Sequence, residues 1–240
     1  MKNNPIRAFA VACPAVVLLA AAIAQESVPP LPAPYHTPSA NNRPHVIDRP
    51  DGARLSLPQG FDIDEYAAGF ERPRFMLNAP GGQVLLTDSV NNGTVYVLFD
   101  RNKDHKAEDR KALISGLDRP YGMALWNGYL YVAETTSVKH SRFDAKNLTV
   151  GSGEEVIPMR EFGQGHWTRS VLFDPEGKKL YVGIGSRSNV SPGEPERRAA
   201  INRFNPDGSG HEIYASGTRN PIGMRWYPGT NVLWAAVQER

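Results

Sequence analysis

Short apolar runs separated by turn residues recur along the chain from residue 57 to its end. The runs that we expect to form strands are 83–87, 94–99, 130–133, 141–143, 179–184, 201–204, 211–215 and 232–237. They are rich in Val, Ile, Leu and aromatic side chains, which is typical of buried β-strands. No stretch shows the i, i+3, i+4, i+7 apolar spacing of an amphipathic helix. The pattern therefore predicts an all-β fold in which helix is minor.

Two local signals refine this prediction. Residues 61–67 alternate apolar with polar side chains, which predicts a half-buried strand. The sequence NNG at 91–93 lies between two apolar runs, and Asn-Gly supplies the positive φ angles that a tight hairpin needs. We therefore expect a first strand at 61–67 and a hairpin turn at 91–93.

A motif that opens a pair of apolar runs occurs four times, and we call it the blade-opening motif. It reads RPRFM at 72–76, RPYGM at 119–123, WTRSV at 167–171 and RNPIGM at 219–224. The copies follow one another at steps of 47, 48 and 53 residues. A period of this length in an all-β chain predicts a β-propeller of four-stranded blades. A propeller brings one loop of each blade to a single axis, where a ligand can bind.

The number of repeats suggests that the ring is incomplete. Four blades of this length do not close a ring comfortably, and the chain ends directly after the apolar run 232–237. An open ring would leave a long unpaired strand edge, which folded proteins avoid. We expect an N-terminal fragment of a longer propeller, with a small propeller closed on itself as the alternative.

The N-terminus resembles a secretory signal peptide. Lys2 and Arg7 precede an apolar run at 8–21, and the small residues at 22–24 fit a cleavage site. A membrane anchor is the alternative, but the run is shorter than the roughly 20 residues that a spanning helix needs. Cleavage after residue 24 removes Cys13, the only cysteine, so no disulfide is available to the mature protein. We expect a periplasmic or secreted protein with no membrane span after cleavage.

The remaining composition excludes some partners. The chain has 27 Lys and Arg against 25 Asp and Glu, and both cations of the excess leave with segment 1–24. Because the remaining charges balance, the chain lacks the net positive charge that is typical of nucleic-acid-binding proteins. Segment 25–56 contains seven prolines and few aliphatic residues, which predicts an extended arm or linker before the propeller domain at 57–240. A first irregular strand at 46–55 is the alternative for part of that arm.

The third and fourth copies of the motif carry side chains suited to catalysis. His166 precedes a predicted strand, where a propeller presents side chains to its axis, and histidine titrates near neutral pH as a general base does. Arg219 offers a rigid cationic fork to a carboxylate or a developing oxyanion, and Asn220 can both donate and accept. The alternatives are structural: a loop histidine that links blades, and an Asn-Pro turn tied by an arginine.

A separate candidate site lies at 100–108. Asp100, Asn102 and Asp104 place oxygen ligands at alternate positions, as in the first half of a calcium loop. The expected glycine is replaced by His105, and Lys111 stands where the last ligand should be. A structural calcium site and a solvated hairpin tip are both consistent with these residues.

Three ordered segments, 165–169, 173–186 and 214–223, resemble the soluble quinoprotein sugar dehydrogenases. The resemblance covers residues 57–240 and is nearest to the sorbosone dehydrogenase-like branch of the glucose/sorbosone dehydrogenase family. It implies a six-bladed propeller that binds pyrroloquinoline quinone (PQQ) and calcium. It also implies oxidation of an aldose or an aldehyde such as sorbosone, with electrons passed to an acceptor such as a periplasmic cytochrome or quinone.

The resemblance also implies roles for individual residues. His166 matches the base that takes the hydroxyl proton. Arg219 matches the arginine beside the quinone carbonyl, and Asn220 matches its cofactor-binding neighbour. Backbone carbonyls after the last strand would help to hold calcium, which here implicates Glu239 and Arg240. The glutamine that some glucose-oxidising members have near the second repeat is not evident at 116–120, so glucose is not an expected substrate. The fifth and sixth blades, which supply further cofactor contacts in the family, are absent, so this chain alone is not expected to hold PQQ.

Two other functions fit an axial propeller site. A metal-dependent lactonase-type hydrolase would need carboxylates converging on the axis, for which Asp88 and Glu134 are candidates. A non-enzymatic propeller that serves as a binding platform would show the same repeats. We take the quinoprotein as the first hypothesis because His166 and the Arg219–Asn220 pair occur in successive blades.

Overall fold

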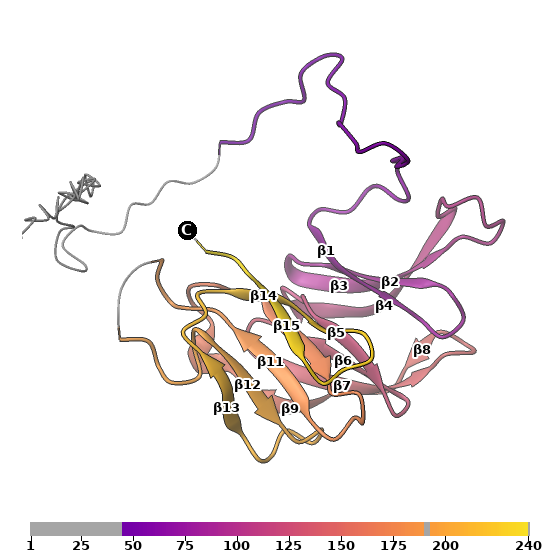
Figure 1. Ribbon diagram of the computed structural model, residues 1–240. Coiled ribbons are helices and arrows are strands. Elements are labelled where there is room, and N and C mark those ends of the chain that lie inside the picture. The colour runs from indigo at the N-terminus through magenta and orange to yellow at the C-terminus, as the bar shows by residue number, and fades with distance from the viewer. Residues whose placement is uncertain (1–44, 190–192, 240) are drawn as a thin grey trace, which may run out of the picture. The chain divides into compact units, whose positions relative to one another are not determined.

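The part of the chain described by the computed structural model, residues 45–189 and 193–239, is almost entirely β-strand and turn (Figure 1). The predicted signal peptide at 1–24 and residues 25–44 of the predicted arm lie outside the described residues, so both remain predictions. Residues 45–56 of the arm form no regular strand. No helix in the described ranges is long and apolar enough to cross a membrane.

The strands form successive antiparallel sheets, and the first strand of each sheet begins within one copy of the blade-opening motif. Blade 1 contains β1 (Pro73–Asn78), β2 (Val84–Asp88), β3 (Asn91–Phe99) and β4 (Asp109–Asp118). Blade 2 contains β5 (Met123–Trp126), β6 (Tyr129–Ala133), β7 (Ser137–Asp144), β8 (Thr149–Val150) and β9 (Glu154–Pro158). Blade 3 contains β10 (Arg169–Phe173), β11 (Leu180–Ile184), β12 (Ala200–Phe204) and β13 (Glu212–Ser216). In blade 4 the described residues form β14 (Pro221–Trp226) and β15 (Leu233–Val237).

The first strand of each blade lies nearest the axis. Strand β10 contacts β5 on one side and β14 on the other, and β1 contacts β5. The sheets therefore follow one another around an axis with their innermost strands adjacent, as in a β-propeller. The single short helix in the described part is the 3₁₀ turn η1 (Arg160–Phe162), just before the loop that carries His166.

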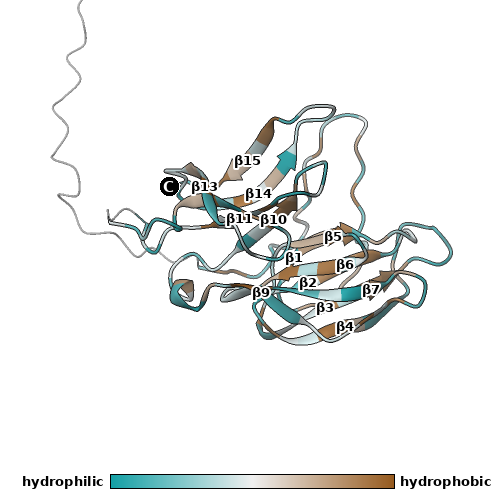
Figure 2. Ribbon diagram, turned by 90° about the horizontal axis from the view of Figure 1, so that it is seen from below, coloured by the Kyte–Doolittle hydropathy of each residue, from teal (hydrophilic) through white to brown (hydrophobic). Residues whose placement is uncertain are grey.

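Hydrophobic cores lie between successive blades. One core joins blades 1 and 2 through Leu85, Val97 and Leu130. A second joins blades 2 and 3 through Ile157, Leu180 and Phe204, and a smaller one joins blades 3 and 4. Figure 2 shows that the strands carry the hydrophobic stretches, whereas the connecting loops are mostly hydrophilic. Burial between facing sheets explains why central strands read as nearly continuous apolar runs.

Polar side chains also join adjacent blades at the axial end of the strands. The Thr87 hydroxyl donates to the carbonyl of Tyr121 over 3.1 Å, and the Ser89 hydroxyl donates to that of Pro120. Between blades 3 and 4, the Ser170 hydroxyl donates to the carbonyl of Pro221 over 3.1 Å. These bonds fix the blade-opening motifs relative to one another.

Tryptophans contribute to the same packing. Trp126 of blade 2 stacks on Phe173 of blade 3, with ring centroids 5.6 Å apart. Trp226 of blade 4 donates its indole N–H to the carbonyl of Phe173 over 2.7 Å. Trp234 is 63% exposed on β15, which has no further strand beside it among the described residues.

One of the two local predictions of the first strands was wrong. Residues 61–67 form no strand, and Phe61 and Ile63 are 67% and 56% exposed, because no described strand pairs with them. The turn predicted at 91–93 does lie in the connection between β2 and β3, since the last pair of that hairpin is Asp88 with Thr94 and Asn92 has a φ of 59°. Residues 91–93 also pair with the end of β4, so they form the start of β3 as well. A second hairpin with a two-residue loop joins β5 and β6, where Asn127 and Gly128 have φ angles of 47° and 76°.

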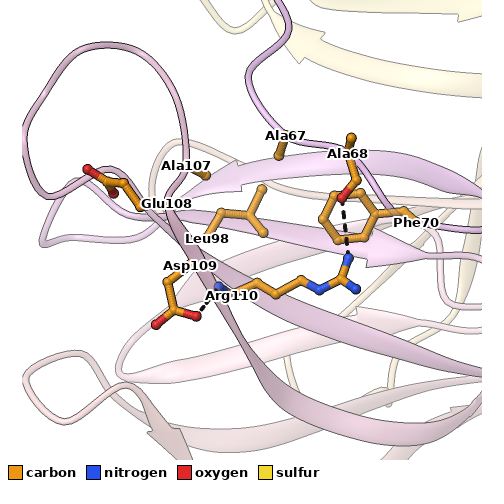
Figure 3. A pocket seen from close by; sticks show the side chains of 8 residues that line it. All are labelled: Ala67, Ala68, Phe70, Leu98, Ala107, Glu108, Asp109 and Arg110. Carbon is orange, nitrogen blue, oxygen red and sulfur yellow. Dashed lines mark hydrogen bonds between the residues drawn. The ribbon is translucent and has the colours of Figure 1, made fainter.

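Arg110 of β4 holds the segment that precedes β1 against blade 1. Its guanidinium donates to the carbonyl of Gly69 over 2.7 Å and lies over the rings of Phe70 and Tyr96, at 4.7 and 5.3 Å from their centroids. Figure 3 shows Arg110 beneath Phe70 and beside Leu98, where these side chains line a cavity of about 250 Å³. This cavity shares no lining residue with the one that contains His166.

Candidate functional site

Side chains from all four blades line one cavity at the axial end of the innermost strands. Its volume is about 310 Å³. The lining residues are Arg74, Tyr121, His166, Trp167, Thr168, Asn220, Ile222 and Gln238. They come from the blade-opening motifs, from the residue directly before the third copy, or from the residue that follows β15. Of the predicted site residues, His166 and Asn220 are therefore brought together here.

His166 is held by one ring nitrogen, and the other has no hydrogen bond within the part of the chain that the structure describes. Its Nδ1 lies 2.8 Å from the backbone carbonyl of Ser186, and its own backbone N–H donates to the same carbonyl over 3.1 Å. A carbonyl can only accept, so Nδ1 carries the proton in the neutral ring. The Nε2 lone pair is then available to accept a proton, which is the arrangement that a general base requires.

The surroundings keep the imidazole neutral. Burial lowers the pKa of His166 below its ordinary value, and the nearby Arg219 and Arg198 guanidiniums lower it further. The Ser186 carbonyl and the Glu194 carboxylate act in the opposite direction, with smaller total effect. A histidine of this kind is uncharged at neutral pH and can accept a proton there.

Asn220 is buried beside His166. Its Oδ1 accepts from the Thr168 hydroxyl over 3.2 Å, and its Nδ2 faces the Gln238 side-chain oxygen at 3.4 Å. Gly185, at the end of β11, separates the two candidate side chains. A Cβ at Gly185 would lie 2.4 Å from Asn220 Oδ1 and 2.6 Å from His166 Cβ, so this close approach requires glycine.

Arg219 is close to this cavity but does not line it. Its guanidinium donates to the Asn189 side-chain oxygen over 2.5 Å and to the Gln238 carbonyl over 2.9 Å. Its charge nevertheless acts on His166 by lowering that residue's pKa. The predicted contact of Arg219 with a cofactor therefore remains a prediction.

Several lining residues were not predicted from the sequence, among them Arg74, Tyr121 and Gln238. Tyr121 donates its hydroxyl to the carbonyl of Ile222 over 3.0 Å and so links blades 2 and 4 across the axis. Arg74 and Tyr121 occupy the same position of the blade-opening motif, as does Ile222. Alignment of the motif copies is thus the signal that could have identified Arg74 and Tyr121, whereas Gln238 lies outside the motif.

The predicted calcium loop is an internally bonded hairpin tip. An Asp100 carboxylate oxygen accepts from the backbone N–H of His105 over 3.1 Å, Asn102 Oδ1 accepts from that of Asp104 over 3.0 Å, and His105 has a φ of 68°. No group of three or more His, Cys, Asp or Glu side chains gathers in the described ranges. Calcium binding by Asp100, Asn102 and Asp104 therefore stays a prediction.

The other metal candidates follow β15. Glu239 lies beside Arg219, whose backbone N–H donates to the Glu239 carboxylate over 3.3 Å. Arg240 lies outside the described residues. The calcium contacts expected from these two backbone carbonyls thus stay a prediction as well.

The carboxylates considered for a hydrolase bind backbone N–H groups of the propeller itself, Asp88 near β1 of its own blade and Glu134 at the end of β4 in the preceding blade. Asp88 accepts from the backbone N–H groups of Glu71 and Arg72, over 3.1 and 2.5 Å. Glu134 accepts from the backbone N–H of Asp118 over 2.6 Å and pairs with Lys139 at the same distance. Neither lines the axial cavity, so no observation favours a lactonase-type site here.

Comparison with known proteins identifies relatives over most of the chain. The sequence model of the TrAA12-like family matches residues 55–239. An uncharacterized protein of Borreliella burgdorferi is 24% identical over an alignment of 193 positions, which covers 75% of this chain and 48% of that protein.

Solved structures agree with the fold. The carbohydrate-active enzyme of family AA12 from Trichoderma reesei gives a TM-score of 0.61 at 19% identity, over 72% of this chain and 47% of that one. The holo PQQ domain of pyranose dehydrogenase from Coprinopsis cinerea gives 0.57 at 18% identity, over 67% and 42% of the respective chains. The β-propeller predicted from the repeats is thus confirmed. The chain spans about half the length of these relatives.

Proposed function

Since the chain belongs to the TrAA12-like family, whose model matches residues 55–239, we propose that the parent protein is a PQQ-dependent oxidoreductase. Its substrate would be an aldose or a sugar-derived aldehyde such as sorbosone, with calcium as a second cofactor. Support comes from the axial cavity and from relatives that include the PQQ domain of pyranose dehydrogenase and an AA12 enzyme with a calcium structure.

One observation carries the proposal. His166 lines the cavity with Nδ1 bonded to the Ser186 carbonyl, so that Nε2 is the free proton acceptor. The same cavity contains Asn220, whose amide can orient a ligand oxygen, and the cationic Arg74. A site with a neutral base and surrounding cations suits a substrate hydroxyl together with an anionic cofactor.

The residues present fit PQQ, which is planar and carries carboxylates. Arg74 and Arg219 supply cationic donors, and Tyr121 and Trp167 supply aromatic surfaces, with ring centroids 6.0 Å apart. When bound, PQQ would supply the two-electron acceptor for oxidation. Calcium would be held in part by the backbone carbonyls of Glu239 and Arg240, as the family resemblance implies.

The chain's own contribution is proton removal and orientation. His166 Nε2 accepts the hydroxyl proton of the substrate, and Nδ1 remains bonded to Ser186, so the ring keeps its orientation as it becomes charged. Asn220, fixed by Thr168, orients the oxygen that reacts. Arg219 stabilises negative charge that develops on a ligand oxygen, since a guanidinium needs no reorganisation to do so.

We also propose a periplasmic or secreted location and an electron acceptor such as a periplasmic cytochrome or quinone. The support is the signal-like segment 1–24 in the sequence. A membrane span after cleavage and a nucleic-acid partner are not part of this proposal.

A dye-linked assay of the native gene product at its natural length tests the function. Aldoses and sugar aldehydes are supplied with and without PQQ and calcium. Activity that requires PQQ supports the proposal and ranks the substrates. A correctly folded, PQQ-treated protein that oxidises none of them contradicts it, and a lactone panel then tests hydrolysis.

The pH dependence of kcat/KM should reflect the protonation of the His166 ring. The base must be neutral, and because the pKa of His166 is lowered, its charged form accumulates only below the ordinary value of about 6.5. We therefore expect activity to fall as pH decreases, with a midpoint below 6.5, and no loss from this group at higher pH. A midpoint clearly above 6.5 would argue against a buried, cation-flanked base.

Replacement of Arg219 by lysine should weaken catalysis although the charge is kept. An ammonium cannot hold Asn189, Gln238 and a ligand oxygen with one planar fork. We expect kcat to fall about 10-fold, equivalent to one charge-assisted hydrogen bond of roughly 1.5 kcal/mol. The matched control is Arg225→Lys, at an exposed position on β14. Equal kcat values for the two variants would contradict the proposed role of Arg219.

A further inference from the structure

Two arginines without a carboxylate partner are buried next to His166. Arg169 and Arg198 are 0% and 3% exposed, and neither forms an ion pair within the described ranges. Burial of a cation is costly unless its donors are satisfied. Backbone carbonyls accept from the Nη atoms of both arginines, whereas Arg169 Nε has no hydrogen-bond partner among the described residues. The position of those carbonyls indicates what the two guanidiniums do.

Arg169 donates hydrogen bonds to backbone carbonyls of the loop that carries His166. Its Nη1 donates to the carbonyl of His166 over 2.7 Å and to that of Thr168 over 2.8 Å. Its Nη2 donates to the carbonyl of Phe162, the last residue of η1, over 2.6 Å. One side chain thereby fixes both ends of the loop.

Arg198 joins that loop to Gly185, the residue that follows β11. Its Nη2 donates to the carbonyls of Phe162, over 3.2 Å, and Gln164. Its Nη1 donates to the carbonyl of Gly185 over 3.0 Å. Gly185 immediately precedes Ser186, whose carbonyl accepts the His166 Nδ1 proton. Arg198 therefore ties together the two segments between which the His166 hydrogen bond forms.

We propose that Arg198, assisted by Arg169, is a positioning residue that holds His166 in the Nδ1-protonated form with Nε2 directed to the axial cavity. This inference rests on the proposed role of His166 as a base. A planar fork with several donors suits the task, because it can bind carbonyls of two segments at once. Neither arginine lines the cavity, so neither is a catalytic residue.

The charges around His166 are consistent with this role. Arg198 and Arg219 face it as cations and Glu194 as the opposing carboxylate. Removal of the Arg198 charge, or loss of the geometry it maintains, should alter both the tautomer and the pKa of His166. If Arg198 only stabilised the loop, its replacement would change neither the tautomer nor the pKa of His166.

The test uses Arg198→Lys in the full native protein, with Arg197→Lys as the matched control. Arg197 is adjacent in sequence and lies over the Phe162 ring, at 5.1 Å from its centroid, but within the described residues it donates to none of these loop carbonyls. Nitrogen NMR of labelled histidine, assigned with His166→Asn, reports tautomer and pKa without any need for cofactor or turnover. Steady-state kinetics are measured in parallel.

We expect Arg198→Lys to convert His166 to a mixture of tautomers, to move its pKa towards the ordinary value and to lower kcat about 10-fold with little change in KM. Arg197→Lys should change none of these. A folded Arg198→Lys variant with unchanged tautomer, pKa and kcat overturns the proposal, even if its Tm is lower.

A second variant and a measurement on the wild-type protein test the same role of Arg198. If Arg198→Lys does not fold, Arg169→Lys is measured with the same readouts and the same expected direction. If wild-type His166 is found protonated on Nε2 at neutral pH, the inference is wrong without any variant. Absence of dehydrogenase activity would contradict the proposed function but would leave the NMR test of positioning intact.

Discussion

Replacement of His166 by alanine should lower kcat by about 10²- to 10⁴-fold, which is the usual contribution of a positioned general base. The variant loses Nε2 as proton acceptor, whereas Asn220, Thr168 and the surrounding arginines keep their own hydrogen bonds. Cofactor binding should therefore be nearly unchanged. The measurement is steady-state turnover of the PQQ-loaded native protein, together with titration of PQQ binding.

The control for this prediction is His140→Ala. His140 lies in blade 2, where its ring stacks on Tyr129 with centroids 4.7 Å apart, and it does not line the cavity. A loss of turnover in both variants would indicate a general structural defect. Unchanged turnover in His166→Ala alone would reject His166 as the base.

Replacement of Gly185 by alanine should lower kcat by about 10²-fold, which is the effect that a misplacement of roughly 1 Å can have. The new methyl group would lie within 2.6 Å of both Asn220 Oδ1 and His166 Cβ, so at least one of them must move. Neither group is chemically altered, and the defect should therefore be one of geometry. Turnover and the His166 tautomer should both change.

Gly223→Ala is the matched control on the neighbouring innermost strand. A Cβ there would lie 3.7 Å from the Ala236 Cβ, which is an ordinary van der Waals contact. We expect nearly normal turnover from this variant. Normal turnover from Gly185→Ala would show that the spacing between His166 and Asn220 is not critical.

The repeats were sufficient to predict the blades. A blade is built mainly from contacts between neighbouring runs, and its strand order follows the chain, so the spacing of the blade-opening motif carries the information. His166 and Asn220 were predicted for the same reason, because their places directly before and within successive motif copies imply neighbouring loops. The structure places both in one cavity.

A local pattern failed where a partner strand decides the outcome. Residues 61–67 have the alternation of a strand, but no described strand pairs with them; a backbone bond from Ala107 reaches Tyr66, and Arg110 binds the carbonyl of Gly69 just beyond the segment. The Asn-Gly sequence at 91–93 does mark the hairpin between β2 and β3, and pairing with β4 on the other side makes the same residues part of β3. Whether a segment forms a strand therefore depends on the strands that pair with it.

The amino-acid sequence alone specifies the all-β class, the succession of blades and two members of the axial site, because these follow from periodicity and from motif position. Only the tertiary structure brings Arg74, Tyr121 and Gln238 to the same cavity, since they are far apart in the chain. The protonated nitrogen of His166 and the burial of Arg169 and Arg198 also depend on it. These features arise from carbonyls of distant segments that meet only when the blades assemble, and no pattern within one segment encodes them.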